Sequence, residues 1–449
     1  VNSANDENGG WNAMRYGIAE ALFKFDDNME VIPWLAESYE VNDEHTEWTI
    51  KLKDGIKFSD GCDLTPTKVK EYFDHMKEVG PSGSAKPEKY LEFEAEVTVD
   101  DDANTINIKT SKPYANLVGQ LCHPTMGITD VEHIENYDNG IIGTGPYKIE
   151  SWDEGQAITL VKNEDYFKGE PAIDKVVFKI VPDDNAKALQ LKSGELDLAL
   201  LTPKDAAAFA DDEAYTCYDM KTSDYRGIMF NFGNEYWQKN RDLIPAVCYG
   251  LDRQAIIDAV LLGQGMPAYG PLQRNIYNYE DVEHYDYNPE KAKEILEAAG
   301  CEMGDDGFYY RDGEKVGFVI SVSAGDQVRI DMAQIAAQEL KEIGMDVSVE
   351  IPAQTDWAGQ MAFLIGWGSP FDADDHTYKV FGTDKGANYS SYSNEDVDKY
   401  LTEARQSDDP EVRKEAYANF QKALAEDPAY AMICYIDANY VADSNIKGI

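Results

Sequence analysis

Apolar and polar residues alternate in several short segments of the N-terminal half, a pattern typical of half-buried β-strands. The segments with this alternation are 47–61, 104–110 and 157–163. The first contains an Asp-Gly pair, so we predict a β-hairpin that turns there. Thr65 can cap a helix and Pro66 suits its first turn, so a helix is predicted from there to about Val79.

The C-terminal half changes to helical periodicity from Asp242 onward. One helix is predicted between Asn288 as its cap, with Pro289 at its first position, and Gly300 as its end. A β-α-β unit is predicted next, with a strand over 316–323, an amphipathic helix over 327–344 and a strand over 345–352. The order of elements predicts two α/β domains.

The size and the charge of the chain narrow the classes of function. Its 449 residues exceed what one core usually supports, so two domains of roughly 200 residues are expected. The net charge of −44 would repel nucleic acids and anionic membranes, so we expect neither as a partner. A content of 11% aromatic residues indicates a folded protein, since disordered acidic chains are poor in aromatics.

The common signatures of catalysis are absent from the sequence. It contains no H-E-x-x-H, no G-x-S-x-G, no phosphate-binding G-x-x-x-x-G-K and no G-x-G-x-x-G after a strand. Six cysteines are scattered without a C-x-x-C pair, and we expect most of them to be buried as small apolar residues. These absences favour a binding protein over an enzyme.

Three long segments carry a resemblance to a known family. They begin with "VIPWLAESYEV" (31–61), "GTGPYKIESW" (143–199) and "RGIMFNFGN" (226–265). In this order they resemble the family 5 extracellular solute-binding proteins of ABC importers, which include dipeptide-, oligopeptide- and nickel-binding members. The resemblance implies an α/β, two-lobed periplasmic-binding-protein-like fold of type II, in the large cluster with an extra β-rich subdomain.

The resemblance also implies how the chain is divided between the lobes. Lobe I would hold residues 1–228 plus 437–449, with the extra subdomain at about 40–140, and lobe II would hold 229–436. Two crossing strands, at 226–232 and 434–443, would form the hinge and let the lobes close on a ligand. By the family pattern, a first strand is expected upstream of Val1 and a further segment after Ile449.

The segment "WGSPFDADDH" (367–376) corresponds to a cleft loop of lobe II. Nickel-type members resemble W-G-x-P-Y-D followed by a nearby histidine, and Trp367, Asp372 and His376 match this form, with Phe371 in place of tyrosine. Trp367 is expected to form a stacking wall of the pocket, because an aromatic between glycines in a loop packs poorly in a core; a core residue is the alternative. Peptide-type members pair an acidic residue with the α-amino group of the ligand, and Asp372, Asp374 or Asp375 could fill that role.

Other residues expected to contact the ligand lie in further segments that line the cleft in this family. Trp11, Asn12 and Arg15 occupy one of them, and Tyr90 stands where nickel-type members have a cleft aromatic. His123 lies at or beside the position of an arginine that grips chelates in nickel-type members and is absent here, as is a second histidine further along.

We therefore expect His123 and His376 to be metal ligands from opposite lobes. For these residues a structural role is the alternative to ligand binding. His376 could be a hydrogen-bonding loop residue, Arg15 could pair with a surface acid, and Tyr90 could pack on a helix face.

The predicted function is the substrate-binding component of an ABC importer. The chain would act as a monomer, either periplasmic or lipid-anchored on the outer face of the membrane, and deliver a small molecule to the permease. We expect a nickel or related metal chelate as the ligand, with nickel belonging to the ligand and no intrinsic cofactor. A di- or oligopeptide is the alternative. A secreted metal-dependent hydrolase using the carboxylates near Asp372 and His376 is a remote alternative.

Overall fold

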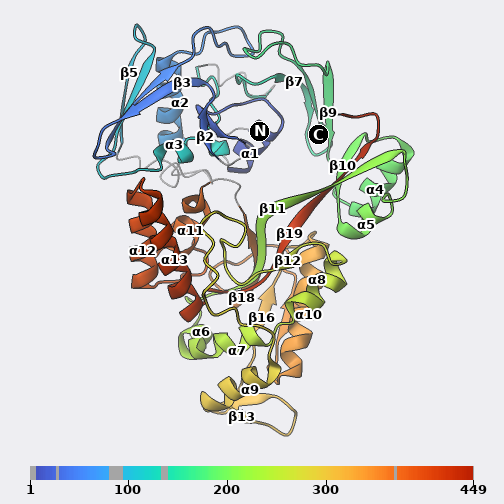
Figure 1. Ribbon diagram of the computed structural model, residues 1–449. Coiled ribbons are helices and arrows are strands. Elements are labelled where there is room, and N and C mark those ends of the chain that lie inside the picture. Colours follow the sequence, from blue (N-terminus) through green and yellow to red (C-terminus); the bar gives the residue numbers. More distant parts are fainter. Residues whose placement is uncertain (1–6, 27–29, 80–94, 133–139, 369–371, 448–449) are drawn as a thin grey trace. The chain divides into compact units, whose positions relative to one another are not determined.

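The computed structural model describes residues 7–26, 30–79, 95–132, 140–368 and 372–447 (Figure 1). The chain forms two compact units, of which unit 1 is Val1–Ile180 with Arg405–Val412 and unit 2 is Val181–Ala404 with Arg413–Ile449. The lobe boundaries expected at 228 and 437 fall within unit 2 and stay a prediction. No described helix has both the length and the apolar character that a membrane crossing requires.

Unit 1 contains a four-stranded antiparallel sheet in the order β3-β4-β6-β5. Along β4 the side chains alternate between exposed and buried, so Trp48, Ile50 and Leu52 point into the core. The helix predicted from Pro66 is confirmed as α2, which contacts β5 and β6. The sheet and its helix comprise β3 (Ala36–Val41), β4 (Glu47–Leu52), β5 (Glu96–Asp100), β6 (Thr105–Lys109) and α2 (Pro66–Val79).

The hairpin predicted over 47–61 is wrong. Strand β4 ends at Leu52, and the chain beyond its Asp-Gly turn does not pair back onto it. The reason is that both edges of β4 are already taken, by β3 on one side and by β6 on the other. A central strand has no free edge for a hairpin partner.

The rest of unit 1 consists of small elements around a second apolar core. This core includes Ala13, Ile18 and Leu160, with Tyr16 stacked on Phe178 at a centroid distance of 4.2 Å. The sheets are β1-β2 and β7-β8-β9, both antiparallel. The elements are α1 (Glu7–Arg15), β1 (Phe23–Phe25), β2 (Val31–Pro33), α3 (Leu117–Gln120), η2 (Pro124–Met126), β7 (Tyr147–Asp153), β8 (Ala157–Lys162) and β9 (Lys175–Lys179).

Unit 2 is organised by a seven-stranded sheet in the order β10-β19-β11-β18-β16-β17, with β12 pairing β19 as well. The two longest strands, β11 and β19, run antiparallel side by side (Figure 1). A separate small sheet has the order β13-β14-β15. The strands are β10 (Leu198–Leu201), β11 (Tyr215–Phe230), β12 (Met266–Pro267), β13 (Glu302–Met303), β14 (Tyr309–Arg311), β15 (Glu314–Lys315), β16 (Val319–Ser321), β17 (Ser348–Glu350), β18 (Ala362–Trp367) and β19 (Tyr430–Asp443).

The β-α-β unit predicted over 316–352 is confirmed, because β16 and β17 pair in parallel and α10 connects them in the chain. The predicted helix start is confirmed too, since the Asn288 side chain accepts a hydrogen bond from the amide of Lys291. The helices after residue 180 are α4 (Asp184–Ser193), α5 (Pro203–Ala207), α6 (Glu235–Asn240), η4 (Arg241–Leu243), α7 (Ile244–Tyr249), α8 (Arg253–Leu261), α9 (Pro289–Ala298), α10 (Gln327–Glu342), α11 (Ala373–Phe381), α12 (Glu395–Gln406) and α13 (Pro410–Glu426).

The pairing of β11 with β19 is interrupted by a bulge, and a buried carboxylate with two cationic partners stabilises it. The register shifts between Lys221 and Tyr225. At this point the fully buried carboxylate of Asp437 accepts hydrogen bonds from Lys221 Nζ at 2.7 Å and from Arg274 Nη1 at 2.6 Å. Arg274 also donates to the carbonyl of Thr222 inside the bulge at 2.8 Å. The two cations compensate the charge of the buried carboxylate and fix the irregular backbone beside it.

We predict that Asp437→Asn lowers the free energy of unfolding by about 3 kcal/mol, because it leaves Arg274 close to the interior without its carboxylate. Urea unfolding followed by circular dichroism measures this change. The matched control is Asp219→Asn, which changes an exposed carboxylate on the neighbouring strand β11 and is expected to cost below about 0.5 kcal/mol. Equal effects of the two variants would contradict the importance of the buried group.

Candidate functional site

The candidate residues of unit 1 meet where α1 packs on η2. The close approach depends on Gly10, since a Cβ there would lie 3.0 Å from the Cα of Thr125. Trp11 contacts the His123 ring edge-on at a centroid distance of 5.6 Å, and the Arg15 guanidinium lies 4.9 Å from the centre of the Trp11 ring. Three of the predicted contact residues of unit 1, far apart in sequence, therefore lie together.

His123 has a structural role in this group, because its side chain caps η2. Its Nδ1 accepts a hydrogen bond from the amide of Thr125 at 3.2 Å and lies 2.9 Å from the Thr125 hydroxyl. The ring is only 2% exposed. A metal that used Nδ1 would have to displace the bond from the Thr125 amide, so the metal role of His123 stays a prediction.

Arg15 and Asn12 complete the predicted set on α1. Arg15 is exposed and Asn12 is half-buried, and both follow Trp11 along the same short helix. The guanidinium lies over the indole, and its planar donor groups can bind a carboxylate in two-point fashion.

The candidate residues of unit 2 begin with Trp367 at the end of β18. Its indole Nε1 donates to the hydroxyl of Tyr430 at 3.3 Å, and its ring stacks on Tyr389 at 5.9 Å with an angle of 23°. Tyr389 in turn stacks on Trp357 at 4.7 Å with an angle of 27°. We call Trp357, Tyr389 and Trp367 the aromatic row.

Two members of the aromatic row, Trp357 and Tyr389, are not among the site residues predicted from the sequence. Trp357 is 39% exposed, and Tyr389 and Trp367 are half-buried, so the row lies partly at the surface. The available signal was a lone tryptophan within the polar stretch "PAQTDWAG" (352–359). Half-exposed stacked rings offer a flat apolar surface to another planar group.

Asp372 initiates α11 and is engaged within the fold. Its Oδ1 accepts a hydrogen bond from the amide of Asp374 at 2.9 Å, which caps the helix, and it also accepts one from Arg413 Nη2. The pair is well buried, with exposed side-chain fractions of 13% for Asp372 and 11% for Arg413. A ligand ammonium at Asp372 would compete with this guanidinium.

His376 lies on the inner face of α11 and is 2% exposed. Its Nε2 is 3.3 Å from the carbonyl oxygen of Pro271, so the neutral ring donates there and leaves a lone pair on Nδ1. Among the described residues this buried Nδ1 has no hydrogen-bond partner. Burial lowers the pKa of His376, which keeps the ring neutral, the form that ligates metals.

The neighbouring carboxylate Asp375 bonds to Lys379 at 3.1 Å on the same helix. Two predicted contacts, Tyr90 and Phe371, lie outside the described residues, as does Pro370 of the quoted motif. Within unit 2, Asp372 therefore caps the helix α11 that carries His376, and Trp367 ends the strand that precedes this helix.

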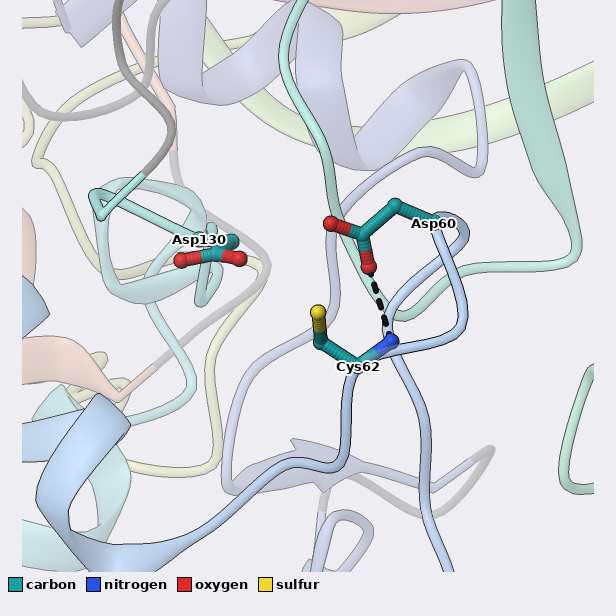
Figure 2. Close-up of side chains that lie close together, drawn as sticks. All are labelled: Asp60, Cys62 and Asp130. Carbon is teal, nitrogen blue, oxygen red and sulfur yellow. Dashed lines mark hydrogen bonds between the residues drawn. The ribbon is translucent and has the colours of Figure 1, made fainter.

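Within the described ranges, one group of three His, Cys, Asp or Glu side chains could offer ligand atoms within 4.8 Å of one another, namely Asp60, Cys62 and Asp130. Asp60 and Cys62 come from one turn and Asp130 from another segment (Figure 2). Asp60 raises the pKa of the Cys62 thiol and so disfavours the thiolate that binds metals. Lys68 Nζ also lies 3.2 Å from the Asp130 carboxylate, where it opposes a metal cation. This group does not enter the candidate site.

Comparison with protein families identifies the chain. The model described as bacterial extracellular solute-binding proteins, family 5 Middle, matches residues 30–389. The chain belongs to this family. Its members are extracytoplasmic components of ABC importers that bind small ligands and deliver them to the permease, and they are not enzymes. The predicted family, fold class and transport function are confirmed.

Curated relatives of this family 5 protein cover nearly the whole chain. Protein XP55 of Streptomyces lividans is 31% identical over 448 residues, which cover 96% of this chain and 81% of the relative. The oligopeptide-binding protein AppA of Bacillus subtilis is 31% identical over 456 residues, which cover 95% and 82%.

Solved structures agree on the fold. NikZ from Campylobacter jejuni, in complex with Ni(L-His), has a TM-score of 0.88 and 29% identity and covers 96% of this chain and 90% of its own. AppA from Bacillus subtilis, in complex with a nonapeptide, has a TM-score of 0.83 and 26% identity, with 98% and 91% covered. The family 5 chain thus resembles both a nickel-chelate binder and a peptide binder.

We predict that Asp372→Asn destabilises the protein by about 3 kcal/mol, because Arg413 is left buried without its carboxylate while the cap of α11 is kept. The double variant Asp372→Asn/Arg413→Met removes both charges and is expected to cost less than the single variant. Urea unfolding of both variants measures the difference. A double variant less stable than the single variant would show that the pair is not the source of the effect.

Proposed function

We propose that the ligand of this importer component is a metal chelate, with nickel as the metal. The observation that carries the proposal is the similarity to NikZ in complex with Ni(L-His), which extends over 96% of this chain at a TM-score of 0.88. The side chains fit this class of ligand, since the aromatic row offers a surface for an imidazole ring and Arg15 offers donors for a carboxylate.

The candidate histidines favour a metal that arrives inside its chelator. His123 caps η2 through Nδ1, and His376 is buried against the Pro271 carbonyl. One nitrogen of each ring is engaged in the fold and both side chains are 2% exposed, so a bare metal ion would have few ligand atoms within reach. A chelator that supplies most of the ligand atoms removes this limitation. Direct ligation by His123 or His376 is then an addition to chelate binding and not its basis.

A di- or oligopeptide is the second candidate ligand. It is supported by the 31% identity to AppA and by the similarity to AppA in complex with a nonapeptide. The carboxylates at the start of α11 could receive the α-amino group of a peptide. This role would require Asp372 to share its charge with Arg413, which makes a peptide the less favourable ligand.

We infer further that this chain binds its ligand without converting it, works as a monomer and is periplasmic or lipid-anchored at the outer face of the cell membrane. The absence of catalytic motifs in the sequence supports the first inference. Its consequence is that the ligand is recovered unchanged after prolonged incubation, whereas a metal-dependent hydrolase would release new products. Mass spectrometry of the incubated ligand distinguishes the two.

The ligand class is tested by thermal unfolding and calorimetric titration of the whole chain. We expect nickel with L-histidine to stabilise the protein by about 2.7 kcal/mol at 100 times the dissociation constant. Nickel alone and L-histidine alone serve as controls and are expected to give much smaller shifts. If a peptide panel stabilises the protein and nickel with histidine does not, the ligand is a peptide, and the transport function stands.

Variants test the predicted contacts one unit at a time. Trp367→Ala in unit 2 and Arg15→Gln in unit 1 are each expected to weaken chelate binding about tenfold, through loss of stacking and of a charged hydrogen bond. Arg329→Gln, which removes a positive charge from α10, is the control and should leave the affinity within about twofold. His376→Gln is expected to change the affinity less than Trp367→Ala does. The reverse order would make His376 a direct metal ligand.

A further inference from the structure

Three lysines of unit 1 surround one tryptophan. Lys24 Nζ lies 3.6 Å from the centre of the Trp34 ring, Lys168 Nζ lies 4.8 Å from it and Lys53 Nζ lies 5.8 Å from it. Lys53 is also 5.8 Å from the ring centre of Phe167, which contacts Trp34 edge-on. We call Lys24, Lys53 and Lys168 the lysine cluster.

The lysine cluster is assembled from separate parts of the fold. Lys24 belongs to β1, Trp34 follows β2, Lys53 follows β4 and Lys168 lies in the turn after β8. Such a convergence is unexpected in a chain with 84 acidic and 40 basic residues. It is not a consequence of neighbouring positions in the sequence.

Within the described ranges, no ion pair joins the lysine cluster to a carboxylate. Other lysines of unit 1 are paired, for example Lys51 with Glu37 at 2.7 Å and Lys109 with Glu47 at 2.6 Å. In the cluster, Lys53 donates to the carbonyl of Trp34, and the Trp34 ring provides cation–π contacts for Lys24 and Lys168. An ammonium has three N–H donors, so most donors of the cluster have no acceptor among the residues that the structure describes.

The nearby carboxylates, Glu20 and Glu37, accept hydrogen bonds from other side chains. Glu20 is buried and accepts hydrogen bonds from Trp34 Nε1 at 2.8 Å, from the Tyr166 hydroxyl at 2.7 Å and from the Thr144 hydroxyl at 3.2 Å. Glu37 is bonded to Lys51. Burial and repulsion by Lys168 and Lys24 lower the pKa of Lys53, while Glu20 and Glu37 oppose this only in part. Because Glu37 is paired with Lys51, the three ammonium groups of the cluster outnumber the one remaining carboxylate of these two, Glu20, and leave an excess of positive charge.

We propose that the lysine cluster is a binding site for a phosphate-type oxyanion, separate from the residues predicted to bind the transported ligand. An anion there would accept the unused N–H donors and relieve the repulsion between the ammonium groups. Lysine ammoniums act as compact point charges, which suit a tetrahedral oxyanion, whereas planar carboxylates are favoured by the fork of arginine. The cluster contains no arginine.

The oxyanion can be free or can belong to a phospholipid headgroup, and the two sources share the same chemistry. For the free anion the probe is inorganic pyrophosphate, titrated calorimetrically into the whole protein at constant ionic strength. Citrate is the comparison, because it has similar charge but planar carboxylates. We expect pyrophosphate to bind and citrate to bind at least fivefold more weakly.

Charge-matched variants locate the binding. Lys24→Gln and Lys168→Gln are each expected to weaken pyrophosphate binding about tenfold, because each removes a charged donor. Lys109→Gln removes the same charge from a paired lysine of the same unit and is expected to change the affinity less than twofold. Circular dichroism confirms that each variant is folded.

The lipid arm uses sedimentation with phosphatidylglycerol vesicles and with phosphatidylcholine vesicles. The site is assigned to a headgroup if the protein binds the anionic vesicles, the Lys24 and Lys168 variants lose this binding, and pyrophosphate does not bind. The site is assigned to a free anion if pyrophosphate binds and the Lys24 and Lys168 variants weaken that binding. Three results would each overturn the proposal: citrate binds as tightly as pyrophosphate, Lys109→Gln weakens binding as much as Lys24→Gln does, or neither pyrophosphate nor the vesicles bind. None of these measurements involves nickel or a peptide, so the result is independent of the transported ligand.

Discussion

The backbone pairing of β11 with β19 is the constraint on which unit 2 depends. Strand β11 has 16 residues and β19 has 14, and together they form the longest ladder among the described strands. Every other pairing in this sheet is built outward from the two strands, with β10 and β12 on β19 and β18 on β11. Because one residue of slip turns every side chain to the opposite face, the register of this ladder fixes the positions of the candidate residues on the strands of unit 2.

The register shows how the ladder positions the aromatic residues. Trp367 of β18 pairs with Tyr225 of β11, and Tyr430 of β19 pairs with Met229 four residues along the same strand. Strand β11 thereby holds Trp367 and Tyr430 on its two sides, close enough for the indole to donate to the phenol. A shift at the bulge would break this contact, and Asp437 with its two cations opposes such a shift.

Much of the architecture could be predicted from the sequence where local signals agreed with the tertiary structure. The cap at Asn288, the start of α2 at Pro66 and the parallel strands around α10 all have local causes. The hairpin over 47–61 was wrong because alternation identifies a strand but not its partner, and β4 took both partners from distant segments. Pairing partners are decided by the tertiary structure, which the local pattern does not contain.

The candidate site shows the same limit at the level of side chains. The segment from Trp367 to His376 could be recognised by its residues, but the partners that define their roles lie far away in the sequence. Arg413 engages Asp372, the Pro271 carbonyl engages His376, and Tyr389 extends the stacking surface of Trp367. A histidine in a polar motif is easily read as a metal ligand, whereas its burial gives it a role in packing as well. Of the candidate residues in unit 2, the half-exposed ones are chiefly aromatic, which supports the proposal that a planar chelator is recognised and not the metal it carries.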